Sequence, residues 1–159
     1  MIDVFLLLGS NLGDREAYLQ AAVQHIETDI ARVVKRSAVY QTQSWGKTDE
    51  PDYLNQVIKL KTGLQPAVIL QKILAIEISM GRKREIKWGS RIIDIDILFY
   101  GRAIINEPGL QIPHPELHKR MFTLIPMSEI APDFIHPVLG KSIFQLKSEL
   151  NSDLIVKKF

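Results

Sequence analysis

Apolar and polar positions in the first part of the chain repeat with the spacing of strands and of a helix. Val4 to Leu8 is a short apolar run closed by the turn-forming stretch GSNLGD, which predicts a buried strand. Asp14 is a favourable N-cap residue, so a helix is expected to begin after it. The apolar positions of that helix recur three and four residues apart: Leu19, Ala22, Val23, Ile26 and Ile30. A second strand is expected from Val33 to Thr42.

The middle of the chain continues this order with a loop, a strand and a helix. Residues 43–52, QSWGKTDEPD, are polar and predict a loop. Residues 53–61 alternate with period two, which predicts a strand. One side of it should carry Leu54, Ile58 and Leu60, and the other Tyr53, Asn55 and Val57. Pro66 suits the first turn of a second helix, which Gly81 should end. Its apolar stripe consists of Ile69, Ile73, Ile76 and Met80.

The remaining segments predict one more strand and several short helices. A charged loop, RKREIKWGSR, leads into a strand that carries Asp94 and Asp96, and GRAIINEPG predicts a hairpin. After Pro113 the chain is expected to be helical in pieces: after Pro115, from Phe122 to Glu129 and from Ser142 to Leu150. The order of elements predicts a single α+β domain over residues 1–159. We expect a ferredoxin-like antiparallel sheet with helices on one face, plus extra C-terminal helices.

Composition and charge exclude several classes of protein. Of the 159 residues, 46% are hydrophobic and 24% charged, which is the balance of a globular chain. A net charge of only +2 argues against a dedicated nucleic-acid binder. The absence of cysteine excludes disulfides, thiolate zinc sites and a cysteine nucleophile. No apolar run approaches the roughly 18 residues that a membrane helix needs. We therefore expect a cytoplasmic protein, and a monomer.

Asp94 and Asp96 stand out because they interrupt an apolar strand. Residues two apart on a strand face the same side, with Cα atoms about 6.6 Å apart, so the neighbouring isoleucines should face the core. Two carboxylates at this spacing can bind Mg²⁺, which takes one or two carboxylates together with phosphate oxygens. The alternative is a pair of solvated acids on an exposed sheet face.

A run of basic residues precedes the two acids. It holds five basic side chains and the single acid Glu85: Arg82, Lys83, Arg84, Lys87 and Arg91. Such a run is often only a solvated loop. Next to two carboxylates, however, arginines that grip phosphate oxygens complete the groups that phosphoryl transfer requires. The GKT and GKS stretches lack the upstream glycine of a P-loop, and no zinc-binding pattern occurs.

Three further residues could have a structural or a binding role. His114 lies between two prolines in PHPELHKRMF, and local sequence supports either role equally. Tyr53 and Asn55 share a strand face, which can be ordinary sheet surface. An aromatic ring beside an amide can also stack on a flat heterocycle and hydrogen-bond to its edge.

Taken together, these segments resemble the hydroxymethyl-dihydropterin pyrophosphokinases of folate biosynthesis. The most specific one is WGSRIIDIDIL, and PDYLN, MGR, PHPELHKRMF and PMSEIAP recur in the family's order and spacing. The resemblance runs from GSNLGDRE to about EIAPDF, while the last twenty or so residues are uninformative. It implies a small α+β enzyme that transfers pyrophosphate from ATP to the hydroxymethyl group of 6-hydroxymethyl-7,8-dihydropterin. The products would be the pterin diphosphate and AMP.

At the phosphate end, the resemblance implies that Asp94 and Asp96 bind two Mg²⁺ ions. Arg82 and Arg91 would contact the transferring phosphates, and these four residues form the expected catalytic set. Further positions expected to contact ATP are Arg84, Trp88, His114 and Arg120. The loop of residues 82–90 is expected to close over the site as a lid when both ligands are bound. Which of Lys83 and Lys87 serves as a loop lysine stays open, and no general base is assigned.

At the pterin end, the resemblance implies that Tyr53 and Phe122 sandwich the ring. Asn55 would be its amide partner, and Thr42 would line its edge. Gln43 and Ser90 replace prolines that are usual in the family.

A rival hypothesis is a non-catalytic sheet module that binds single-stranded RNA. Such a module needs paired aromatic residues on central strands and a basic sheet face. Only Tyr53 meets the first requirement, and two acids in the sheet would repel phosphates in the absence of metal. Titration with an RNA homopolymer, with and without Mg²⁺, separates the two hypotheses.

Overall fold

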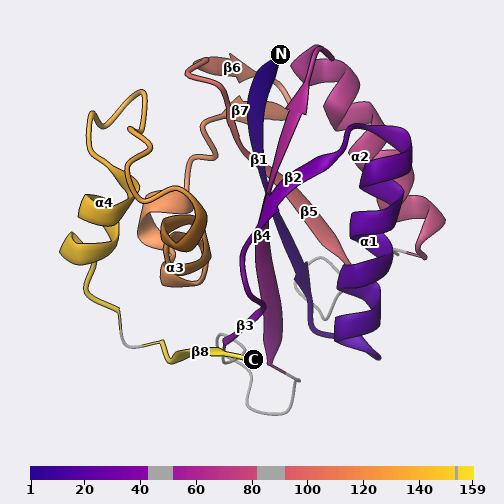
Figure 1. The fold of residues 1–159 in the computed structure, drawn as a ribbon, viewed down its shortest axis with the longest axis horizontal. Coiled ribbons are helices and arrows are strands. Elements are labelled where there is room, and N and C mark those ends of the chain that lie inside the picture. Colours follow the sequence, from indigo (N-terminus) through magenta and orange to yellow (C-terminus); the bar gives the residue numbers. More distant parts are fainter. Residues whose placement is uncertain (43–51, 82–91, 153) are drawn as a thin grey trace.

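The computed structural model describes residues 1–42, 52–81, 92–152 and 154–159, and Figure 1 shows their arrangement. In chain order, the elements are β1 (Ile2–Ser10), α1 (Arg15–Asp29), β2 (Val33–Arg36), β3 (Tyr40–Thr42), β4 (Tyr53–Thr62), α2 (Pro66–Ser79), β5 (Asp94–Tyr100), β6 (Ile105–Glu107), β7 (Leu110–Ile112), the 3₁₀ turn η1 (Leu117–Lys119), α3 (Met121–Ile130), α4 (Ile143–Glu149) and β8 (Val156–Lys158). The predicted strands, helices and hairpin are present with boundaries shifted by a few residues, except that one predicted strand is divided in two.

The main sheet is antiparallel, with β1 and β4 in its interior. Its strand order is β5-β1-β4-β3-β8, and β2 also pairs with β4. Leu6 of β1 lies opposite Ile58 of β4 on one side and Ile97 of β5 on the other. With the helices α1 and α2 between the strands, this order confirms the ferredoxin-like α+β prediction.

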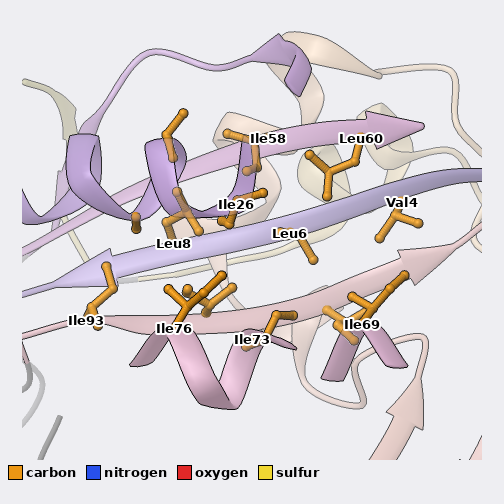
Figure 2. Packing of buried hydrophobic residues seen from close by; sticks show 14 of the residues in the cluster. Val4, Leu6, Leu8, Ile26, Ile58, Leu60, Ile69, Ile73, Ile76 and Ile93 are labelled. Carbon is orange, nitrogen blue, oxygen red and sulfur yellow. The ribbon is translucent and has the colours of Figure 1, made fainter. Parts of the chain in front are cut away.

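One face of the sheet packs against α1 and α2. Figure 2 shows isoleucine and leucine side chains of the strands meeting those of the helices. Because residues two apart share a strand face, Val4, Leu6 and Leu8 all point into this core. The predicted stripes of both helices are buried here, Ile26 among them on α1 and Ile73 on α2.

The opposite face carries a second core, which corrects the expectation that helices cover one face only. Phe5, Leu7 and Val57 of the sheet pack against α3 and α4, whose buried residues include Leu124 and Ile143. Helices therefore lie on both faces, as Figure 1 shows for α1 and α2 on one side and α3 on the other. The expectation fails because seven of the ten positions of α3 are apolar and they do not gather on one side of the helix, so a second buried surface accommodates them.

The predicted strand from Val33 to Thr42 is interrupted. Ser37 lies between β2 and β3, and its Oγ accepts a hydrogen bond from the Val57 N–H at 3.0 Å. The Ser37 N–H donates to the Val57 carbonyl oxygen at 2.9 Å. A serine hydroxyl thus replaces a backbone carbonyl in the ladder, and the strand divides into two.

The C-terminal strand β8 was not predicted. Val156 lies opposite Thr42 and Lys158 opposite Tyr40, so β8 adds a strand outside β3. Gly81, the glycine expected to end the second helix, follows α2 and has φ +91°, the left-handed conformation typical of a glycine at a helix end. In the parts of the chain described above, no helix is long and apolar enough to cross a membrane.

Candidate active site

A cavity of about 690 Å³ lies between the sheet and the layer formed by η1 and α3. The residues that line it are Leu7, Gly9, Thr42, Tyr53, Asn55, Asp94, Asp96, Glu116, Lys119, Arg120, Phe122, Asn151, Ser152 and Leu154. Seven of the site residues predicted from sequence are in this set: Thr42, Tyr53, Asn55, Asp94, Asp96, Arg120 and Phe122.

Strand register explains why residues from three strands form the floor of the cavity. Gly9 of β1 lies opposite Asp94 on one side and Asn55 on the other. Directly opposed residues of antiparallel strands point to the same face of a sheet. Two strand spacings of about 4.8 Å put the backbones of Asp94 and Asn55 roughly 10 Å apart, with only a glycine between them. Tyr53 and Asp96 share this face because each is two residues from one of these positions.

The backbone that carries the two acids is fixed by a buried carboxylate on the helix side of β5. Ile93, Ile95 and Ile97 face the α1–α2 core, as predicted. Glu77 on α2 is 4% exposed, and its Oε2 accepts a hydrogen bond from the Ile95 N–H at 2.9 Å. That N–H belongs to the residue between the two aspartates, so Glu77 fixes the backbone that carries both. Sequence reasoning missed Glu77, although its place four residues after Ile73 put it on the buried stripe.

The donor set at the two aspartates fits magnesium. Within the described residues, no group of three or more histidines and acids could hold a metal ion. Mg²⁺ dehydrates reluctantly and is usually bound by one or two carboxylates plus substrate phosphates. A pair of half-buried carboxylates on the cavity floor meets that requirement without a third protein ligand.

An amide and a hydroxyl line the floor beyond Gly9. Asn55 is 5% exposed, and its Nδ2 donates to the Leu8 carbonyl oxygen at 3.3 Å. A Cβ on Gly9 would lie 2.7 Å from that Nδ2, so only glycine leaves room for the amide. Thr42 Oγ1 is buried without a hydrogen-bond partner among the described residues. A buried hydroxyl that lines a cavity can be satisfied by a ligand.

The roof is the start of α3, which is anchored at its far end. The Arg120 guanidinium carbon lies 5.6 Å from the centre of the Phe122 ring, in a cation–π contact. At the end of α3, Glu129 accepts hydrogen bonds from the Tyr40 hydroxyl at 2.5 Å and the Ala38 N–H at 2.9 Å. Burial, then the Glu129 hydrogen bond, raise the pKa of Tyr40 to about 12, so Tyr40 remains a donor.

His114 lies beside the cavity but not in its lining. Its backbone N–H donates to the Leu98 carbonyl oxygen at 3.0 Å, and its ring Nδ1 accepts from the Glu116 backbone N–H at 3.1 Å. Burial, and then the charge of Arg120, lower the pKa of His114 to about 4. The imidazole is therefore neutral near pH 7, with its proton on Nε2.

The remaining predicted positions, Arg82, Arg84, Trp88 and Arg91, lie outside the described residues, as do Lys83, Lys87 and the expected lid. The cavity also has lining residues that sequence reasoning missed: Leu7, Gly9, Glu116, Lys119, Asn151, Ser152 and Leu154. Glu116 and Lys119 carry a signal, since they fall in the quoted PHPELHKRMF stretch. Asn151, Ser152 and Leu154 carry none, because only the fold of β8 brings them to the site.

Comparisons with known proteins agree on one family. Residues 5–132 match the family model for 7,8-dihydro-6-hydroxymethylpterin-pyrophosphokinase (HPPK). Two curated relatives are named 2-amino-4-hydroxy-6-hydroxymethyldihydropteridine pyrophosphokinase. The one from Methylorubrum extorquens is 45% identical over 95% of each chain. The one from Aquifex aeolicus is 43% identical over 94% of this chain and 92% of its own.

Longer proteins contain a similar segment. The folic acid synthesis protein fol1 of Pneumocystis carinii is 41% identical, and the match covers 88% of this chain but only 19% of that protein. A crystal structure of a Plasmodium falciparum HPPK-DHPS triple mutant with pteroate has a TM-score of 0.75 at 19% identity. It covers 93% of this chain, and the match spans 43% of that longer chain. At this identity, the structural likeness supports the fold alone.

Proposed function

We propose a role for each part of the cavity on the premise that this chain belongs to the 7,8-dihydro-6-hydroxymethylpterin-pyrophosphokinase family. The enzyme transfers pyrophosphate from ATP to hydroxymethyldihydropterin in folate biosynthesis. The observation that carries our assignment is the cavity floor, where two carboxylates and a buried amide flank Gly9 on one sheet face. One end of the floor suits phosphates, and the other suits a flat heterocycle.

The phosphate end is formed by Asp94 and Asp96. In the reaction, the hydroxymethyl oxygen bonds to the β-phosphorus, and the bond from this phosphorus to the α–β bridging oxygen breaks as AMP leaves. We propose that the two carboxylates hold two Mg²⁺ ions, which when bound neutralise phosphate charge and orient the reactants. Arg82 and Arg91 are proposed to stabilise the charge that develops on the departing bridging oxygen. Arg84 and Trp88 are proposed to contact ATP from the same loop.

The pterin end is formed by residues of three elements. Tyr53 from the floor and Phe122 from the roof would stack on opposite faces of the ring, since aromatic stacking orients a flat ligand. Arg120 contacts the Phe122 ring and would help to hold it in place. The Asn55 amide and the buried Thr42 hydroxyl would hydrogen-bond to the ring edge, which would give the unpartnered Thr42 Oγ1 a partner.

The nucleotide would lie along the side of the cavity near His114 and Arg120. A neutral His114 carries its proton on Nε2 and can donate from there, while Nδ1 accepts from the backbone. Arg120 can donate several hydrogen bonds to phosphate oxygens. The two residues would thus contact ATP with different chemistry, one as a neutral donor and one as a charged donor.

A direct experiment tests the reaction and the metal assignment together. The protein is incubated with MgATP and 6-hydroxymethyl-7,8-dihydropterin, and adenine nucleotides are separated to find AMP rather than ADP. Asp94→Asn and Asp96→Asn should each remove most of the turnover, with Ile104→Ala as an exposed control. Formation of AMP at the wild-type rate by either aspartate variant would refute the metal assignment.

The same proposal extends to the oligomeric state, the domain organisation and the location of the enzyme. That the enzyme works as a monomer stays a prediction. Both cores share one sheet, which supports treating residues 1–159 as one domain. A cytoplasmic location stays a prediction.

A further inference from the structure

The chain beyond α4 passes along the cavity before it joins the sheet. Figure 1 shows it running from α4 below α3 to β8 beside β3. Asn151, Ser152 and Leu154 in this stretch all line the cavity. The match to the family model ends at residue 132, so that match assigns them no role.

Strand pairing places this segment next to the proposed pterin end. Thr42 lies opposite Tyr53 on one side and Val156 on the other, so all three side chains share one sheet face. Leu154 comes two residues before Val156, on the cavity side. The Phe159 N–H donates to the Val39 carbonyl oxygen at 2.8 Å, which extends the attachment to the chain end.

The two neighbouring apolar residues of this segment have different surroundings. Leu154 is half-buried and lines the cavity, whereas Ile155 is 58% exposed. Asn151 and Ser152 are exposed at the rim. An apolar side chain against the cavity with polar residues at the rim is the arrangement that excludes water from one side of a flat ligand.

We propose that Leu154, held in place by β8, forms the outer wall of the pterin compartment and determines affinity for the pterin but not for ATP. The inference rests on the function proposed above, in which Thr42 and Tyr53 contact the pterin. An apolar wall beside these residues covers the ring edge that the sheet and α3 leave exposed. Pairing of β8 with β3 preorganises the wall, so that binding does not have to order it.

Calorimetry on the full-length protein tests the wall with a matched pair of variants. Binding of 6-hydroxymethyl-7,8-dihydropterin and of MgATP is measured separately for Leu154→Ala and Ile155→Ala. Leu154→Ala should weaken pterin binding about three- to tenfold, because buried apolar contact with the ligand is lost. It should change ATP binding less than about twofold, and Ile155→Ala should change neither. A truncated protein that ends at Ile155 lacks β8, and it should bind the pterin at least as weakly as the Leu154→Ala variant does.

The outcomes separate this inference from the proposed function. If Leu154→Ala binds the pterin as tightly as Ile155→Ala does, the wall is wrong while the reaction can stand. Equal weakening of pterin and ATP binding would also overturn it, since the effect would then be general. If the wild-type protein binds no pterin or releases ADP instead of AMP, the proposed function fails and this inference with it.

Discussion

Gly9 provides the sharpest test of the cavity floor, because its missing side chain makes room for Asn55. In Gly9→Ala, the new Cβ would lie 2.7 Å from Asn55 Nδ2, whereas ordinary contacts are 3.4–4 Å. The amide must therefore move by about 0.7 Å or more, which stretches its 3.3 Å hydrogen bond to the Leu8 oxygen. Leaving a buried polar group unsatisfied costs about 1–3 kcal/mol.

The expected result is a loss of pterin affinity without a matching loss for ATP. With the amide displaced, the pterin group that it would bind is left unpaired in the complex, and a cost of about 1–3 kcal/mol there corresponds to roughly 5- to 150-fold weaker binding, which calorimetry with each ligand resolves. Gly63→Ala is the matched control, since a Cβ there meets nothing within 4 Å. A double-mutant cycle gives a second check: in an Asn55→Ala background, Gly9→Ala should cost little more. Unchanged pterin affinity in Gly9→Ala, or equal losses for both ligands, would refute the reasoning.

Three further predictions concern the phosphate end and its support. Glu77→Leu leaves the buried backbone N–H between the aspartates without its acceptor, so stability should fall by about 1–3 kcal/mol in urea denaturation. The same variant should need more Mg²⁺ for half-maximal turnover, and an unchanged requirement would mean that Glu77 does not position the acids. Asp94→Asn and Asp96→Asn should lose most turnover yet keep pterin affinity within about threefold by calorimetry; a larger loss would place the metal assignment in doubt. The pKa of His114 falls from 6.5 to about 4 in the folded protein, so folding favours the neutral imidazole. The resulting contribution to the free energy of unfolding is complete above pH 6.5 and is lost as the pH drops toward 4. His114→Asn should flatten this part of the stability curve, by on the order of 3 kcal/mol at most.

The sequence predicted residues whose environment follows from local periodicity. Asp94 and Asp96 alternate with buried isoleucines, so their shared face could be read directly. The closeness of Thr42 to Tyr53 could not, because it depends on the register between two strands. The resemblance to a family supplied that neighbourhood instead.

Other features could not be predicted from the sequence, because side-chain hydrogen bonds or long-range strand pairing create them. Ser37 splits a predicted strand by substituting its hydroxyl for a backbone carbonyl, which periodicity does not reveal. Glu77 lies on an apolar stripe and binds a backbone N–H, a partner that no sequence pattern displays. The short VKK of β8 has little strand signal of its own and is a strand because the edge of β3 accepts it.

The position of β1 between β4 and β5 has a consequence for how the protein is made. The strand is synthesised first, but its partners begin only at Tyr53 and Asp94. An emerging chain therefore carries the apolar run from Val4 to Leu8 without its neighbours until most of the protein has left the ribosome. Pairings this distant in sequence make folding slow and expose strand edges to aggregation. Production of this enzyme should therefore benefit from chaperones that cover the apolar run until its partners have been synthesised.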